Sequence, residues 1–389
     1  MLGLSAILFL PDDSARTGLD RPLMLWPVQG APLLAWLADS LFAAGVGRFF
    51  LVCGERFTQA ALACFPREAE VTTAMDSEPA DLLHVFLSTA EDSEANVSIV
   101  TGPTAYLPDM TSPRGRRVAV CTADRRQLMA ALDETFSFPQ FLRENCAVLS
   151  DNDGFYPIDS LSALLEAGRL LHRERMLRLL RVGVQIYDPD SCYVEPTVEV
   201  EPGAVLLPGT MLRGRSLIRE GAVIGPQSTV EDAEIGPGAR VVSSVVEGAT
   251  VGAAAEIGPY AHLRPGTVLE RGVKIGNFVE VKNSHIGENT WASHLSYLGD
   301  ADVGAGVNLG CGTVTVNFDR VEKHRSTIGD RAFVGCHSAL IAPVRVGPGA
   351  YVAAGTVVTE DVPAEALAIA RTKQSNKKEW AAKHKVAKD

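Results

Sequence analysis

Apolar and amphipathic blocks alternate along the first part of the chain, up to about Val184. The apolar run 4–10 predicts a buried strand, and 48–54 predicts a second one. Between them, residues 32–45 carry apolar side chains at helical spacing and end at Gly45, which suits a helix C-terminus. Strand, helix and strand at this spacing predict a βαβ unit with a parallel sheet.

The same half contains further candidate elements. Residues 97–102 and 117–122 are short apolar runs that predict two more strands. Residues 159–181 predict a long linker helix, with Asp159 or Ser160 as its N-cap. We therefore expect an α/β domain over residues 1–185.

The pattern changes from Val194 onward, where aliphatic residues recur at intervals of six. Small residues and prolines fill the positions between them. This period differs from those of a helix or an ordinary strand, and it is typical of a solenoid whose coils stack on one another. We therefore expect a parallel β-helix over residues 186–365. The aliphatic series comprises Val194, Val200, Leu206, Leu212, Ile218, Ile224 and Val230, then Ile257, Leu263, Leu269, Ile275 and Val281, and finally Ile328, Val334, Leu340, Val346, Val352 and Val358.

Two segments depart from the six-residue period. Residues 314–327 are charged and lack the aliphatic series, which predicts a loop that projects from one face of the solenoid. Residues 366–389 form a basic C-terminal tail, for which we expect some helix.

Composition narrows the functional classes. A formal net charge of −11 disfavours nucleic-acid binding, and no apolar run is long enough to span a membrane. The seven cysteines are scattered and include no CxxC pair, which favours reduced thiols over disulfides or a zinc site. The apolar N-terminus lacks a basic leader, so we expect a strand there and a cytoplasmic protein.

Long blocks of the second half resemble the acetyltransferase half of the bacterial GlmU family, over roughly residues 186–375. This family is the bifunctional glucosamine-1-phosphate N-acetyltransferase and N-acetylglucosamine-1-phosphate uridyltransferase of UDP-N-acetylglucosamine biosynthesis, which feeds the cell wall. The resemblance implies a left-handed β-helix, a homotrimer with sites between subunits, and acetyl-CoA as acetyl donor. The blocks occur in the family's order: LRPGTVL, IGNFVEVKNS, HLSYLGDADVGAGVNLGCGTVTVNFD, KHRSTIGD, LIAPVRVG and AAGTVVTEDVPAEALAIAR.

The resemblance also implies residue roles. His294 matches the catalytic base, whose neutral imidazole suits deprotonation of an attacking amine near neutral pH. Residues matching the contacts to glucosamine 1-phosphate are Arg264 and Lys282 for the phosphate, Tyr297 and Asn308 for the sugar, and Lys323, which matches a residue reaching a neighbouring subunit's site. Residues at acetyl-CoA positions are Cys311, Asn317, Phe318, Cys336, Ala354 and Arg371.

Some positions depart from the family or invite a plainer interpretation. The family usually has Tyr where this chain has Phe318, and small residues or Ser where it has Cys311 and Cys336. We expect these two cysteines to be small buried residues with no activating base nearby. We expect Glu280 to pair with a nearby cation, and the other histidines of this region, His285, His324 and His337, to be structural. Acetyl transfer by this chemistry needs no metal.

The N-terminal half resembles a shortened and degenerate sugar-nucleotide transferase domain. Working enzymes of that kind have a Gly-rich phosphate loop after the first strand, whereas this chain has LFLPDDSARTG. Leu23 stands where the family places a phosphate-binding Lys, and Pro103 stands where a metal-binding Asp is expected. Asp159 alone would make a poor magnesium site. We expect a domain without uridyltransferase activity that supports the trimer or binds a regulator.

Three alternatives stay open. The chain could be the full bifunctional enzyme, with SPRGRR (112–117) supplying phosphate contacts, or a non-catalytic β-helix scaffold. It could also be a zinc carbonic anhydrase on the same solenoid, which would require three convergent histidines, for which His285 and His294 are candidates.

Overall fold

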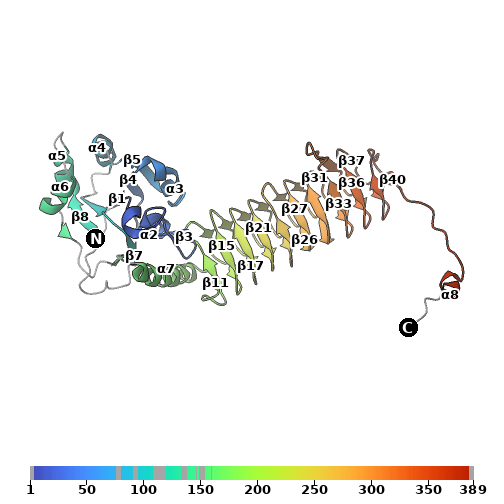
Figure 1. Cartoon of the computed structure of the whole chain (residues 1–389), viewed down its shortest axis with the longest axis horizontal. Helices are drawn as coiled ribbons and strands as arrows, with labels where there is room; N and C mark the ends of the chain where they lie inside the picture. Colours follow the sequence, from blue (N-terminus) through green and yellow to red (C-terminus); the bar gives the residue numbers. More distant parts are fainter. Residues whose placement is uncertain are drawn as a thin grey trace. The chain divides into compact units, whose positions relative to one another are not determined.

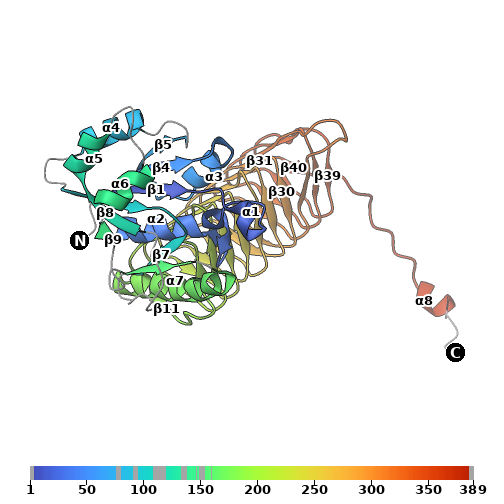
Figure 2. The same cartoon turned by 60° about the vertical axis from the view of Figure 1, so that its left-hand side comes forward.

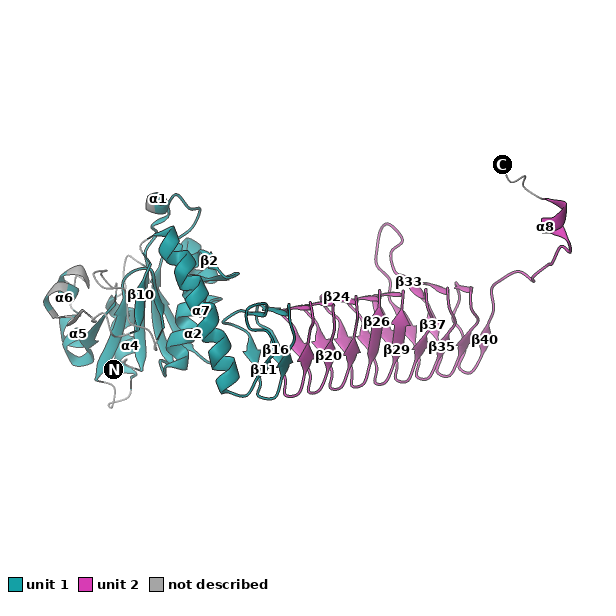
Figure 3. Cartoon of the chain, turned by 90° about the horizontal axis from the view of Figure 1, so that it is seen from below, with its two compact units in different colours: residues 1–218 teal, residues 219–389 magenta. Residues whose placement is uncertain are grey.

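The computed structural model describes residues 4–75, 80–90, 95–107, 120–132, 138–145, 147–148, 154–158 and 160–384. The chain forms two compact units, Met1–Ile218 and Arg219–Asp389 (Figure 3). This division falls among the β-helix coils, so the boundaries at 185 and 365 stay predictions about sequence domains. Within the described residues, no helix is long and apolar enough to cross a membrane.

The first unit contains an α/β domain built on a six-stranded sheet (Figure 1). Strands β1, β4, β5 and β6 pair in parallel, whereas β8 and β9 join the sheet antiparallel. The expected βαβ unit is confirmed, because β1 and β4 are adjacent and parallel on either side of α2 in the sequence. The strand order is β5 (Glu70–Ala74), β4 (Arg48–Cys53), β1 (Ser5–Leu10), β6 (Asn96–Val100), β8 (Val120–Asp124) and β9 (Ala147–Val148).

Helices cover this sheet and bury its core. Trp36 of α2 and Phe49 of β4 are completely buried, and Gly45 follows α2 at a φ of 99°. The long helix begins after Ser160, whose hydroxyl accepts the amide of Ala163, while Asp159 lies outside the described residues. The helical segments are α1 (Ser14–Thr17), α2 (Leu33–Ala43), α3 (Thr58–Leu62), α4 (Ala80–Ser88), α5 (Arg125–Ala131), α6 (Phe138–Asn145), α7 (Leu161–Arg181) and the 3₁₀ turns η1 (Leu23–Leu25) and η2 (Glu55–Phe57).

Two small antiparallel pairs and the first solenoid coils complete this unit. The antiparallel pairs are β2 (Pro27–Val28) with β3 (Ala31–Pro32), and β7 (Thr104–Tyr106) with β10 (Phe155–Pro157). The first coils are made by the parallel pairs β11 (Gln185–Ile186) with β14 (Val205–Leu206), β12 (Tyr193–Val194) with β15 (Met211–Arg213), and β13 (Glu199–Val200) with β16 (Leu217–Ile218).

The second unit is a left-handed parallel β-helix with three sheets, to which successive coils contribute short strands in turn (Figures 1 and 2). Its first sheet contains β17 (Val223–Ile224), β20 (Arg240–Val241), β23 (Glu256–Ile257), β26 (Lys274–Asn277), β29 (Trp291–His294), β32 (Asn308–Leu309), β35 (Phe333–Val334), β38 (Tyr351–Val352) and β40 (Leu367–Ala368). The second contains β18 (Thr229–Glu231), β21 (Val245–Glu247), β24 (His262–Leu263), β27 (Glu280–Lys282), β30 (Tyr297–Gly299), β33 (Val314–Val316), β36 (Ala339–Ile341) and β39 (Val357–Val358). The third contains β19 (Glu234–Ile235), β22 (Thr250–Val251), β25 (Val268–Leu269), β28 (His285–Ile286), β31 (Ala301–Val303), β34 (Ser326–Ile328) and β37 (Arg345–Val346).

The aliphatic residues of the six-residue period fill the inside of the coil. Val281, Leu298 and Leu340, for example, are completely buried in the second sheet. A single coil cannot bury its own apolar edge, so this edge is buried by stacking on the next coil.

The predicted interruption at 314–327 is too long, because its two ends are strands. Thr315 is completely buried at the inward position, and its hydroxyl bonds to the carbonyl of Gly299. A buried threonine therefore continues a pattern that a search for aliphatic residues misses. Only residues 317–325 project as a loop, next to β33 in Figure 3. Near the C-terminus, β40 pairs with β38, and the short helix α8 (Trp380–Lys383) follows in the tail.

Candidate active site

Two cations lie on neighbouring coils of the second sheet. Leu263 pairs with Val281, so Arg264 and Lys282, which follow them, occupy the same column. Arg264 donates from Nη1 to Oε1 of Glu280 at 2.7 Å, which confirms the expected pairing of Glu280. This hydrogen bond raises the pKa of Arg264 and fixes the direction of its guanidinium.

A third cation comes from the projecting loop. The charge of Lys323 lowers the pKa of Lys282, with a smaller contribution from Arg264 in the same direction. Lys323 therefore lies near Lys282 of its own chain. Three positive charges held this close repel one another, and an anion placed among them would relieve that repulsion.

Tyr297 folds back over the same column. Lys282 pairs with Gly299, and a Cβ added to Gly299 would stand 2.3 Å from the Tyr297 hydroxyl and 2.8 Å from Nδ2 of Asn317. The phenol therefore lies across a residue that has no side chain, one coil beyond Lys282. A hydroxyl and an amide thus lie against Gly299, the residue that pairs with Lys282.

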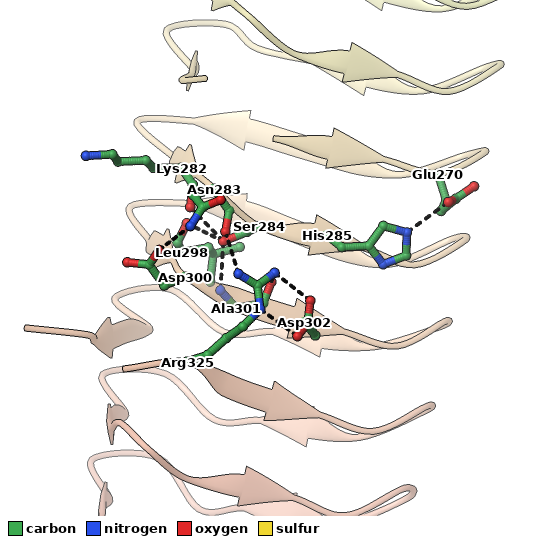
Figure 4. Close-up of polar contacts among 10 residues, drawn as sticks. All are labelled: Glu270, Lys282, Asn283, Ser284, His285, Leu298, Asp300, Ala301, Asp302 and Arg325. Carbon is green, nitrogen blue, oxygen red and sulfur yellow. Dashed lines mark hydrogen bonds and ion pairs between the residues drawn. The ribbon is translucent and has the colours of Figure 1, made fainter. Parts of the chain in front are cut away.

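Asp300 links the neighbouring coils of this site through hydrogen bonds. Its side chain is buried, and its two carboxylate oxygens accept from Nδ2 of Asn283 and Nδ2 of Asn317, each at 2.5 Å. Figure 4 shows Asp300 directed at Asn283 while Lys282 points away from both. No sequence motif singled out Asp300, which directly follows Gly299; its φ of 49° is a conformation in which Asn and Asp are common.

The loop that carries Lys323 is fixed at both ends. Asp319 accepts the amides of Val321 and Glu322, and these bonds, with His324, lower its pKa. Phe318 and Lys323 form an antiparallel bridge across the loop. Arg325 then makes two hydrogen bonds of 2.6 Å to Asp302 and one of 3.1 Å to the carbonyl of Asn283 (Figure 4).

His294 lies at a corner of the coil, at the end of β29, and is exposed. It pairs with Asn277 of the preceding coil. The register of β29, β32, β35 and β38 continues this column through the next three coils, as Cys311, Cys336 and Ala354. The carbonyl of Ala354 accepts from the guanidinium of Arg371. The proposed base and four proposed acetyl-CoA positions therefore follow one edge.

The expectation that the two cysteines are buried is wrong. Cys311 is only partly buried and Cys336 is exposed, because both occupy the outward corner and not the core. Cys311 occupies the column position that follows that of His294, and the expectation that no base activates either thiol stays a prediction.

Asn308 is on a different surface from the cations. It lies on the first sheet, exposed, between Trp291 and Phe333 of the adjacent coils. Two of the remaining histidines have local partners: Nε2 of His285 is 2.9 Å from Glu270, and Nε2 of His324 is 2.8 Å from Asp319. In the part of the chain that the structure describes, no group of three or more His, Cys, Asp or Glu side chains could hold a metal ion.

Comparison with known proteins finds a hexapeptide-repeat family and GlmU relatives. Residues 248–283 match the family described as bacterial transferase hexapeptide (six repeats). Over 237 residues the chain is 49% identical to the Bifunctional protein GlmU of Caldicellulosiruptor saccharolyticus, which covers 61% of this chain and 51% of that protein. This stretch of the chain is homologous to GlmU. The GlmU of Halalkalibacterium halodurans is 47% identical over 221 residues, covering 57% of this chain and 49% of that protein. The chain thus spans about half the length of the GlmU relatives it matches.

Solved structures are more distant. The UDP-N-acetylglucosamine acyltransferase of Francisella novicida is 19% identical, with a TM-score of 0.33 over 47% of this chain and 66% of that one. The inositol-1-phosphate CTP transferase of T. maritima is 15% identical, with a TM-score of 0.33 over 44% of this chain and 97% of that one. TM-scores of this size support no argument about function.

Proposed function

We propose that the second unit transfers an acetyl group from acetyl-CoA to the amine of glucosamine 1-phosphate. The observation that carries this proposal is the column of Arg264 and Lys282, with Lys323 beside it and the Tyr297 hydroxyl across Gly299. A dianionic phosphate among these cations would gain charge-assisted hydrogen bonds and remove their mutual repulsion. Tyr297 then contacts the sugar, whereas Asn308, which lies on the first sheet, can contact it only if the assembly brings that surface to the cations.

His294 is proposed as the general base. It would take a proton from the amine as the amine attacks the thioester carbon, and a backbone N–H of the coil would stabilise the tetrahedral intermediate. His294 is exposed at the corner of the coil, three residues before Tyr297. This position supports the role of base, because the reacting amine must lie between the sugar site and the acetyl donor.

Acetyl-CoA is proposed to lie along the edge that follows His294, past Cys311, Cys336 and Ala354 to Arg371, with Asn317 and Phe318 as further contacts. Arg371 is exposed beyond its bond to Ala354 and can meet the phosphates of the donor. We also propose a homotrimer with sites between subunits, in which Lys323 serves the site beside Lys282 of its own chain, and not a neighbouring subunit's site as the resemblance implies. Light scattering on the purified chain tests the trimer.

The α/β domain is proposed to lack uridyltransferase activity. After β1, the carboxylate of Asp13 accepts the amide of Leu23 at 2.9 Å, and Asp12 accepts the amide and hydroxyl of Ser14. These backbone amides therefore already donate to carboxylates, whereas in a phosphate loop they would donate to the ligand. The Leu23 side chain is buried and offers no cation. Pro103 likewise offers no carboxylate, while Asp159 and the segment 112–117 lie outside the described residues.

Two assays on the purified chain test these proposals separately. Coenzyme A release should require glucosamine 1-phosphate and acetyl-CoA together. Pyrophosphate release from UTP and N-acetylglucosamine 1-phosphate should be absent with or without magnesium. An inactive chain in the first assay would favour the scaffold, and activity in the second, or calorimetric UTP binding at micromolar levels, would revive the bifunctional enzyme.

A further inference from the structure

The edge that carries His294 also carries two thiols on consecutive coils. Leu309 pairs with Val334 in the first sheet, and two residues further along both strands come Cys311 and Cys336. The amide of His337 donates to the carbonyl of Cys311 at 2.7 Å, so the backbones remain adjacent at this point. The two cysteines are therefore neighbours across the coils.

These thiols differ from the other cysteines that the structure describes. Cys311 is partly exposed and Cys336 is exposed, whereas Cys53, Cys64, Cys121 and Cys192 are buried. Burial raises the pKa of Cys64 to about 12 and also raises that of Cys192, which keeps both as unreactive thiols near neutral pH. Only the pair on the edge is open to a reagent among these six.

The spacing of the coils suits a bond between them. Adjacent strands of a sheet lie about 4.8 Å apart, which falls within the roughly 4.4–6.8 Å that separates the Cα atoms of a disulfide. Directly opposed side chains keep about the same separation at Cβ, slightly beyond the disulfide mean of about 3.8 Å, so the two residues must tilt together. A disulfide formed in this way is easily reduced again.

We propose that Cys311 and Cys336 form a reversible dithiol–disulfide site that reacts with low-molecular-weight disulfides, in particular the disulfide of coenzyme A. This proposal rests on the proposed function, since the donor's thiol is expected to lie along the same edge. It assigns to these residues a covalent chemistry beyond contact with the donor.

The reaction balances in two exchanges. The thiolate of Cys336 attacks one sulfur of the small disulfide, the S–S bond breaks, and one coenzyme A thiol leaves. The thiolate of Cys311 then attacks the sulfur of Cys336 in this mixed disulfide, and the second coenzyme A thiol leaves. The two protein thiols are oxidised, the small disulfide is reduced, and the two protons end on the released thiols.

A disulfide between Cys311 and Cys336 would block the binding of acetyl-CoA along the edge beside His294. A disulfide draws the two corners together and removes the space between their side chains. Acetyl transfer should therefore be lost on oxidation and return on reduction, while the stacked core of the coil stays unchanged.

The test uses the full-length protein, reduced, freed of reductant and then treated with coenzyme A disulfide. The remaining thiols are alkylated and the peptides are mapped by mass spectrometry without reduction. We expect a cross-link between Cys311 and Cys336 within one chain, together with release of two coenzyme A thiols per chain. The C336A variant should stop at a mixed disulfide on Cys311, and C311A at one on Cys336; alanine is a matched replacement because Ala354 occupies the same column one coil further.

Three mapping results would overturn the proposal: both cysteines alkylated, coenzyme A retained on the wild-type chain, or a cross-link between chains on a non-reducing gel. The activity arm asks whether oxidised protein loses acetyl transfer, dithiothreitol restores it, and C311A/C336A is insensitive to oxidation. Full activity of the cross-linked protein would show that the disulfide does not block acetyl transfer, which would overturn that part of the proposal. If even the reduced wild type transfers no acetyl group, the proposed function fails, yet the mapping still decides the thiol pair.

Discussion

The position of the Tyr297 phenol across Gly299 can be tested by giving residue 299 a side chain. In Gly299→Ala, the new Cβ would lie 2.3 Å from the Tyr297 hydroxyl and 2.6 Å from its Cζ. Normal separation is about 3.5 Å, so the hydroxyl must move by roughly 1 Å. The backbone of Gly299 is not left-handed, so the substitution itself strains nothing there.

The new Cβ would also stand 2.8 Å from Nδ2 of Asn317, but its closest contacts are with the far end of the Tyr297 side chain, which sets the size of each effect. An off-rotamer tyrosine costs about 0.5–1.5 kcal/mol, which is the expected loss in the free energy of unfolding. A contact misplaced by about 1 Å can lower the reaction rate by roughly a hundredfold. We therefore expect kcat/KM for acetyl-CoA and glucosamine 1-phosphate to fall by roughly tenfold to a hundredfold, together with a modest loss of stability.

The assay follows coenzyme A release and chemical unfolding in four proteins: wild type, Gly299→Ala, Tyr297→Ala and the double variant. If the alanine acts through the phenol, it should add little to Tyr297→Ala, so the two effects will not be additive. Gly238→Ala is the matched control, since Gly238 has a φ of 66° and nothing within 4 Å of an added Cβ. It should lose stability and keep its activity. Wild-type kcat/KM in Gly299→Ala, or additive losses in the double variant, would refute the reasoning.

Three further predictions concern the polar groups. His294→Ala should lower kcat by about 10²–10⁴-fold while acetyl-CoA binding, measured by calorimetry, is unchanged; a variant with wild-type turnover would remove His294 from the mechanism. Arg264→Ala and Lys282→Ala should each raise the KM for the sugar phosphate by roughly tenfold to a hundredfold and leave that for acetyl-CoA near its original value. Equal effects on both substrates would indicate a structural role instead. Lys323 lowers the pKa of Lys282, so Lys282 loses its proton, and its hold on phosphate, at a lower pH than an isolated lysine would. In Lys323→Ala the alkaline rise in KM should therefore move to higher pH, and an unchanged or lower position would contradict the proximity of the two ammonium groups.

The sequence alone determined the architecture of both halves. One aliphatic residue in every six, separated by small residues, is compatible with a three-sided coil and with little else, and Val281, Leu298 and Leu340 are buried as this period requires. The βαβ unit followed equally directly from strand and helix periods. The pattern failed at Thr315, where a hydroxyl satisfied by the carbonyl of Gly299 replaces an aliphatic group. Hydrophobicity cannot signal such a position, because the hydrogen bond that makes burial possible forms only in the folded coil.

The arrangement of the site was decided by the tertiary structure. Sequence motifs named Arg264, Lys282 and Tyr297, but which side chain lies over which backbone depends on the register between coils. The loop 317–325 separates Cys311 from Cys336 in the sequence, so the six-residue period does not predict that they are adjacent. The same loop brings Lys323 close to Lys282. The support from Asp300 is equally non-local, since it joins Asn283 and Asn317 from the preceding and following coils. Local periodicity fixes which residues face inward, whereas the outward contacts between coils also depend on the length and fold of every turn between them.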